Sequence, residues 1–130
     1  MARSESKIIA VDFDGTCVEH EYPNIGLEVE GAVETLQRLV KKGHRIILFT
    51  MRSGDKLDAA VRWFKERRIE LWGINRNPEQ EEWTSSPKVY AHLYIDDAAL
   101  GCPVRFIDGV VRPVVDWAKV SSELEYHGIL

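Results

Sequence analysis

Short apolar segments alternate with amphipathic segments along this sequence, and that alternation restricts its fold more than any other feature. Residues 7–12 and 44–50 are rich in Ile, Val and Leu, and residues 70–74 and 92–96 form two further short apolar runs, as buried strands do. Apolar residues recur at helical spacing between these runs, at Val29, Val33, Leu36 and Val40, and again at Leu57, Ala60, Val61 and Phe64. The pattern predicts one α/β domain over residues 1–130, a three-layer α/β/α sandwich with a Rossmann-like parallel sheet.

The rest of the chain gives weaker signals. Residues 75–86 are polar and predict a loop, after which Ser86-Pro87 is a typical start for a short helix. Asp108-Gly109 lies between two apolar runs and predicts a tight hairpin turn. A final helix is predicted within residues 114–126, where apolar residues return to helical spacing.

Composition narrows the classes of protein to which the chain can belong. Seventeen Lys and Arg against 21 Asp and Glu leave a net charge of −4, which disfavours a general nucleic-acid binder. No apolar stretch is long enough to cross a bilayer, and the polar start of the chain does not resemble a secretory signal. Two cysteines fit neither a disulfide scaffold nor a zinc site, so a cytoplasmic location is expected.

Polar side chains follow the predicted strands where ligands bind in parallel α/β folds, at the carboxyl ends. They are Asp12 and Asp14 after the first strand, Thr50 and Arg52 after the second, and Asp96 and Asp97 after the fourth, with Lys88 just before that fourth strand. Each of these alone has an ordinary explanation, such as a turn residue, a helix cap or a surface lysine. Together they predict a reactive site at one edge of the sheet.

The order of these residues resembles the haloacid dehalogenase-like superfamily, and within it the phosphatases that use an aspartate nucleophile. The resemblance rests on Asp12-Phe13-Asp14-Gly15-Thr16, then Thr50, then Lys88, then Asp96-Asp97, and it spans about residues 7–108. It implies that Asp12 attacks phosphorus and forms an aspartyl-phosphate, while Asp14 protonates the leaving oxygen and then deprotonates the hydrolytic water.

The resemblance also implies roles for the residues around these two carboxylates. Gly15 and Thr16 would fix the turn that directs them, and Thr50 would bind a phosphate oxygen, helped by backbone N–H groups near Phe13 and Met51. Lys88 would neutralise the nucleophile and the phosphoryl group.

The same resemblance implies a magnesium site. Asp96 would bind Mg²⁺ directly, Asp97 would be a ligand or an anchor behind one, and Asp12 and the backbone carbonyl of Asp14 would complete the set. Elementary electrostatics agrees, because two unit charges 4 Å apart repel by about 4 kcal/mol at an effective dielectric constant near 20. A hard divalent cation offsets such repulsion, and the same crowding favours a proton on Asp14.

Two residues near this predicted site have competing explanations. Arg52 is expected to clamp a second anionic group of the substrate, and the alternative is an internal ion pair with Asp14 or Asp55. His20 lies in the polar loop after the nucleophile, where it could touch the substrate or close over it, and the ordinary alternative is a surface histidine.

We therefore expect a magnesium-dependent phosphatase that acts on a phosphorylated small molecule or on an exposed phosphoryl group of a larger substrate. The gaps between motifs are too short for a cap domain. Specificity is then expected from residues 17–28 and 75–86, or from a neighbouring subunit in a homo-oligomer.

Three alternatives remain at this stage. A two-component receiver domain places its acidic pair on the first strand and its lysine at the last, an order that this sequence does not follow. A dehalogenase would lack Asp14. A non-catalytic binding protein with the same fold is the third.

Overall fold

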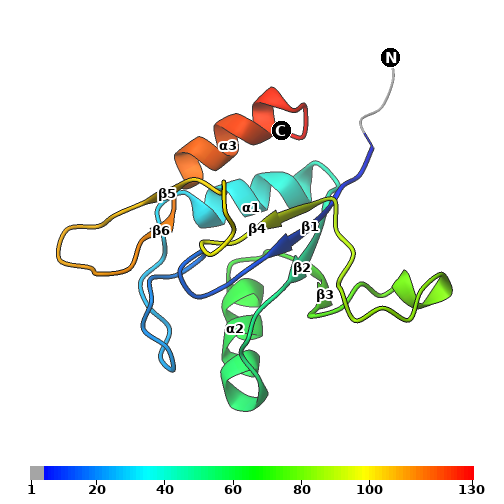
Figure 1. Cartoon of the computed structure of the whole chain (residues 1–130), viewed down its shortest axis with the longest axis horizontal. Helices are drawn as coiled ribbons and strands as arrows, with labels where there is room; N and C mark the ends of the chain where they lie inside the picture. The colour runs from blue at the N-terminus through cyan, green and yellow to red at the C-terminus, as the bar shows by residue number, and fades with distance from the viewer. Residues whose placement is uncertain (1–4) are drawn as a thin grey trace.

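The computed structural model describes residues 5–130, and a four-stranded parallel sheet lies at its centre (Figure 1). The strands are β1 (Ile8–Val11), β2 (Arg45–Leu48), β3 (Leu71–Ile74) and β4 (Leu93–Ile95), arranged in the order β3-β2-β1-β4. This arrangement confirms the predicted α/β fold with a Rossmann-like parallel sheet. Part of the predicted absence of a secretory signal concerns residues 1–4, which lie outside the described residues.

One face of the sheet is covered by all three α-helices. Ile9 pairs with Ile46 and Val11 with Leu48, so these four side chains share one face. They form the main core with α1 (Ala32–Lys41), α2 (Gly54–Glu66) and α3 (Trp117–Tyr126). Trp63, Phe64 and Trp117 are the largest helical side chains buried against them.

The opposite face is covered by residues 75–92, so the third predicted layer is present as irregular chain instead of an α-helix. Val89 and Ala91 pack there against Ile8, Ala10 and Ile47. The segment contains only the 3₁₀-helix η1 (Gln80–Glu82), and the helix predicted to start at Ser86 is not formed.

Side-chain hydrogen bonds explain why residues 75–92 can stay irregular. The Gln80 side chain donates to the carbonyls of Ser86 and Lys88 and accepts the N–H of Tyr90. Asn77 donates to the carbonyl of Tyr90. These two buried amides satisfy backbone groups that a helix would otherwise pair internally.

The C-terminal hairpin holds on to the turn that follows β1. The strands β5 (Val104–Arg105) and β6 (Val114–Val115) are antiparallel, and the predicted turn at Asp108-Gly109 lies in the loop between them. Asp108-Gly109 was expected to form a tight hairpin turn, but the paired residues lie several positions away from it on each side. The Val115 N–H donates to the Gly15 carbonyl at 3.0 Å, and the Trp117 indole donates to the Thr16 carbonyl at 2.7 Å.

The strand order defines where a ligand site can form. From β1 the chain proceeds outward through β2 to β3 and then returns to the other side of β1 as β4. The switch point therefore lies between the carboxyl ends of β1 and β4, where doubly wound sheets open a crevice. Asp12 follows β1 there, and Asp96 follows β4.

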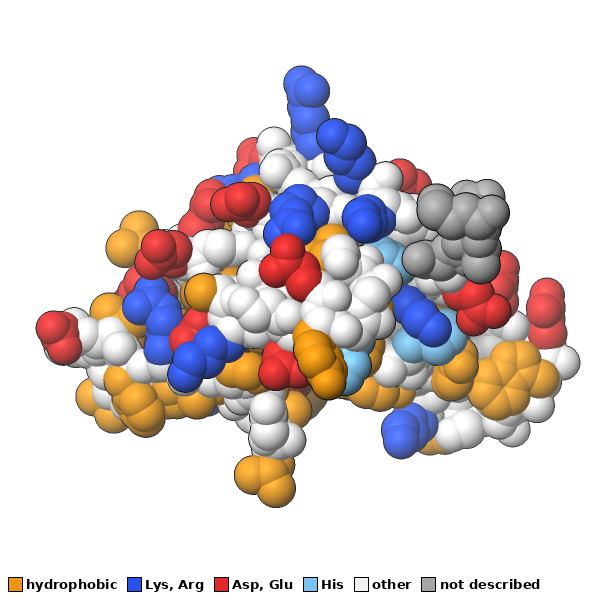
Figure 2. All heavy atoms as spheres, turned by 90° about the horizontal axis from the view of Figure 1, so that it is seen from above, with side chains coloured by type: hydrophobic (Ala, Val, Ile, Leu, Met, Phe, Trp, Pro, Cys, Tyr) orange, Lys and Arg blue, Asp and Glu red, His pale blue; other side chains and the backbone are white. Residues whose placement is uncertain are grey.

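Two observations concern the surface. Within residues 5–130, no helix is both long and apolar enough to cross a membrane. Figure 2 views the molecule from the side on which α3 lies, and acidic and basic side chains are interspersed on that face instead of gathering into one basic patch.

Candidate active site

A cavity of about 890 Å³ opens at the carboxyl ends of β1, β2 and β4. Its lining comes from segments far apart in the sequence: Asp12, Asp14, His20, Glu21, Tyr22, Thr50, Met51, Arg52, Asp96, Asp97, Ala98 and Arg112. Most of the residues predicted for the site meet here. Residues 75–86 instead contribute to a separate cavity of about 340 Å³, so of the two loops expected to govern specificity only 17–28 reaches this site.

The turn after β1 aims the first carboxylates. The N–H groups of Thr16 and Cys17 both donate to the Phe13 carbonyl, at 3.1 and 2.8 Å. Gly15 has a φ of +86°, and a Cβ there would collide with the His20 ring. Only glycine satisfies both requirements, which confirms the predicted role of Gly15 in the turn.

Three carboxylates converge at the switch point. Asp12, Asp96 and Asp97 each offer an oxygen, and these oxygens lie within 4.8 Å of one another. The Thr16 hydroxyl donates to Asp12 Oδ2 at 3.0 Å and accepts the Asp97 N–H at 3.2 Å, so it ties the two strand ends together. All three side chains are half-buried.

This crowding changes the acidity of Asp12. The pKa of Asp12 is raised from 3.8 to about 8, first by burial and then by its contact with Asp97 and the charge of Asp96. A third negative charge is therefore unfavourable in this cluster without a compensating cation. Three carboxylate oxygens are hard donors of the kind that Mg²⁺ prefers, so the residues present fit that ion.

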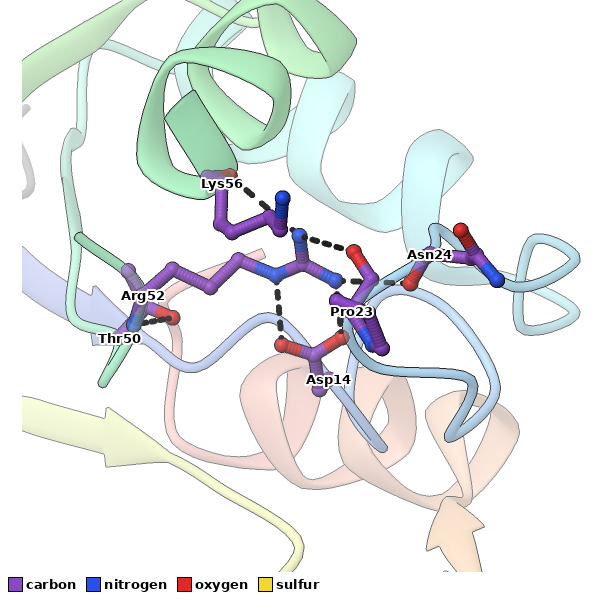
Figure 3. Close-up of polar contacts among 6 residues, drawn as sticks. All are labelled: Asp14, Pro23, Asn24, Thr50, Arg52 and Lys56. Carbon is purple, nitrogen blue, oxygen red and sulfur yellow. Dashed lines mark hydrogen bonds and ion pairs between the residues drawn. The ribbon is translucent and has the colours of Figure 1, made fainter. Parts of the chain in front are cut away.

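Arg52 does not face the substrate space with free donors, and its expected role as a clamp for a second anion is wrong (Figure 3). Its Nε and Nη2 donate to the two oxygens of Asp14, each at 2.8 Å. Its remaining N–H groups donate to the carbonyls of Pro23, Asn24 and Lys56. With all five donors engaged and 2% of its surface exposed, the guanidinium has no donor left for a ligand.

The ion pair also fixes Asp14. Both of its oxygens accept hydrogen bonds from the guanidinium, which is the arrangement of a carboxylate and not of a carboxylic acid. The expectation that crowding favours a proton on Asp14 is not met in this arrangement, because Asp14 faces Arg52 instead of the other acids. The same guanidinium links Asp14 to Pro23 and Asn24 in the neighbouring loop.

Thr50 and two backbone groups near it carry hydrogen-bond donors. The Thr50 hydroxyl accepts the Arg52 N–H at 3.2 Å, which leaves its own proton for another acceptor. The Asn75 side chain holds the Thr50 N–H at 2.7 Å, a contact that the sequence analysis did not predict. Within residues 5–130, no acceptor takes the backbone N–H of Phe13 or Met51.

Lys88 is not brought to the carboxylates. Its side chain is exposed and does not line the cavity, and within the described chain it forms no ion pair with an acid. Its backbone instead belongs to the irregular layer, where its N–H donates to Ser86 and its carbonyl accepts from Gln80. The prediction that Lys88 lies beside the nucleophile is therefore wrong, because the irregular layer leaves its side chain outside the cavity.

Two further residues line the cavity, of which the sequence analysis considered His20 and not Arg112. His20 is half-buried, with Nε2 3.1 Å from Asp97 Oδ2, so it lies in the cavity and is not a simple surface histidine. Arg112 enters the lining from the loop between β5 and β6. No local pattern marks either residue, since both reach the site through the close packing of separate loops around Gly15.

Cys17 has a packing role. It is fully buried in the turn, and burial raises the pKa of its thiol well above the usual value. Its Sγ donates to the Asp12 carbonyl at 3.4 Å. A thiol held in this way is a poor nucleophile.

One solved structure is similar to this protein over nearly its full length. No protein-family model matches the sequence, and no curated protein matches it. A solved structure, described as a conserved protein from Bacteroides thetaiotaomicron, is 37% identical and superimposes with a TM-score of 0.78. The match covers 95% of this chain and 93% of that one.

The chain belongs to the same family as that protein. Because the match extends over nearly the full length of both chains, the parallel sheet and its switch point are features of the family fold. The assignment of chemistry to the site rests on the geometry described above.

Proposed function

We propose that this protein is a magnesium-dependent phosphatase of the haloacid dehalogenase-like superfamily, which hydrolyses a phosphomonoester through an aspartyl-phosphate on Asp12. The observation that carries the proposal is the convergence of Asp12, Asp96 and Asp97 at the switch point, in one cavity with Asp14 and Thr50. A carboxylate nucleophile, a cation site and anion donors are the parts that this chemistry needs.

In the first step, an Asp12 oxygen attacks phosphorus, and the bond from phosphorus to the ester oxygen breaks. The Thr50 hydroxyl and the N–H groups of Phe13 and Met51 donate to phosphoryl oxygens as charge moves onto them. Asp14, carrying the proton that it took from water in the preceding turnover, delivers that proton to the leaving oxygen, so the alcohol departs neutral.

In the second step, water attacks phosphorus, its proton passes to Asp14, and the bond between Asp12 and phosphorus breaks. Asp14 held on Arg52 is already in the form that accepts this proton. Delivery of a proton in the first step requires that one Asp14 oxygen leave the guanidinium, since a protonated oxygen no longer accepts both bonds. Arg52 therefore positions Asp14 through a contact that must loosen once per turnover.

Asp12, Asp96 and Asp97 would hold Mg²⁺, with the backbone carbonyl of Asp14 as a further ligand. When bound, the ion supplies positive charge that offsets the carboxylates and the phosphoryl group. This charge takes over the task that the sequence suggested for Lys88. Positive charge at this position would allow Asp12 to ionise despite its raised pKa.

The cavity is open and has no separate cap, so we expect a phosphorylated small molecule or a phosphoryl group exposed on a larger substrate. A second copy of the chain that covers the site remains our proposal for a homo-oligomer. The two free cysteines fit a reducing compartment, and we place the protein in the cytoplasm on that ground.

The proposal is tested with p-nitrophenyl phosphate and a panel of phosphorylated metabolites, with Mg²⁺ and with EDTA. We expect release of phosphate that needs Mg²⁺ and is lost in Asp12→Asn. The matched control is Asp58→Asn, which removes one exposed carboxylate on α2 and should retain activity. Release that persists in EDTA or in Asp12→Asn would refute the mechanism, and a single slow turnover would favour the receiver alternative.

A further inference from the structure

One cationic side chain of the cavity, among the described residues, is not engaged in an ion pair with another residue of the protein. Three nitrogen-bearing side chains of basic residues line it, namely His20, Arg52 and Arg112. The five donors of Arg52 are all engaged, and His20 lies against Asp97. Arg112 is exposed, and across residues 5–130 it has no ion-pair partner.

The position of Arg112 is set by the fold although its side chain is free. It lies two residues before β6, and β6 is bonded to the Gly15 carbonyl through Val115. The stem of the hairpin is therefore fixed to the turn that carries Asp12 and Asp14. Arg112 lies in the loop next to this stem and lines the same cavity.

The size and charge of the cavity indicate what this guanidinium meets. About 890 Å³ is far more than a phosphate needs and lies within the usual range of about 300–1,000 Å³ for small-molecule sites. The carboxylates lie where the phosphoryl group would be processed, so the remaining volume receives the rest of the substrate. Glu21, which also lines the cavity, disfavours an anion at its own position.

We propose that Arg112 determines specificity by binding a second anionic group of the substrate, a carboxylate or a second phosphate. The proposal rests on the phosphatase function proposed above and names its substrate class, phosphomonoesters that carry another anion. Guanidinium suits this task because its planar fork matches both groups with two parallel hydrogen bonds.

The test compares two probes with the same phosphoryl-oxymethyl unit, 2-phosphoglycolate and ethyl phosphate, which differ by a carboxylate in place of a methyl group. Arg112→Gln should lower kcat/KM for 2-phosphoglycolate by about 10- to 100-fold, the usual effect of losing charged hydrogen bonds. Ethyl phosphate should change by less than about threefold. Arg112→Lys, which keeps the charge without the fork, should fall between.

The matched control is Arg105→Gln, since Arg105 lies on β5 of the same hairpin and pairs with Glu30 at 3.6 Å outside this cavity. It should leave both probes unchanged. An equal fall for both probes in Arg112→Gln would overturn the proposal, because it would place Arg112 on the phosphoryl group. An unchanged ratio between the probes would overturn it too.

A binding measurement separates this proposal from the proposed function. In an Asp12→Asn background with Mg²⁺, calorimetry should show that Arg112→Gln weakens binding of 2-phosphoglycolate and not of ethyl phosphate. If the wild type hydrolyses neither probe but this difference is present, the second-anion site stands and the phosphatase proposal fails. If hydrolysis occurs and the difference is absent, only the second-anion site fails.

Discussion

Asp12→Asn should stabilise the metal-free protein, and increasingly so as the pH rises. Asparagine has the shape of a protonated aspartic acid but cannot ionise. In the folded protein the pKa of Asp12 is raised from 3.8 to about 8, so between these values the folded state holds a proton that the unfolded state has lost. Stability contributed by this group is therefore complete below the unfolded pKa and declines as the pH rises toward the folded one.

The magnitude follows from the proton count. One proton corresponds to about 1.4 kcal/mol per pH unit, so the wild type should lose about 3 kcal/mol relative to Asp12→Asn between pH 5 and pH 7. The total between the unfolded pKa of 3.8 and pH 7 is at most about 4 kcal/mol. Because pH 7 lies below the pKa of Asp12 in the folded protein, the stability difference at pH 7 depends on the pH and hardly on the exact value of that pKa.

Urea unfolding in EDTA at pH 5, 6 and 7 measures this difference, with Asp58→Asn as the control for loss of one negative charge. A free-energy difference between wild type and Asp12→Asn that stays flat or shrinks with pH would show that the carboxylates do not oppose ionisation of Asp12. The reasoning about the acidic cluster would then be wrong.

Three further predictions concern the same site. Arg52→Ala should destabilise the protein by about 3–5 kcal/mol in urea unfolding, because it leaves a half-buried carboxylate and three carbonyls unpaired. Arg76→Ala, which removes an exposed pair, should cost at most about 1 kcal/mol, and equal losses would contradict the role given to Arg52. Gly15→Ala should lose folding or activity at the turn, since its Cβ would meet His20, and normal melting with normal turnover would refute this close packing. Mg²⁺ should raise the Tm of the wild type in a scan against EDTA, and Asp96→Asn should reduce that rise; an equal rise in both would place the ion elsewhere.

The sequence predicted the sheet well because its evidence is local. Each strand is a short apolar run, and each covering helix on the main face has its own apolar stripe, so both can be recognised from neighbouring residues. The layer formed by residues 75–92 could not be predicted in this way. It depends on Asn77 and Gln80, whose amides bond to backbone groups up to 13 residues away.

The residues of the candidate site also fall into two groups, those that local sequence could predict and those that it could not. Asp12, Asp96 and Asp97 were predicted to meet because carboxyl ends of parallel strands share an edge. The partner of Arg52 could not be chosen from sequence, since the ion pair with Asp14 joins residues 38 positions apart. His20 and Arg112 reach the cavity on loops whose paths depend on contacts with Gly15, and no spacing rule describes those contacts.

The central claim is that Asp12 carries the phosphoryl group during turnover. The most direct measurement is mass spectrometry of the protein after acid quench during turnover of p-nitrophenyl phosphate with Mg²⁺. We expect the peptide that contains Asp12 to gain the mass of one phosphoryl group, and this gain to be absent in EDTA and in Asp12→Asn. Turnover with no phosphoryl group on that peptide, or with the group on another residue, would contradict the account.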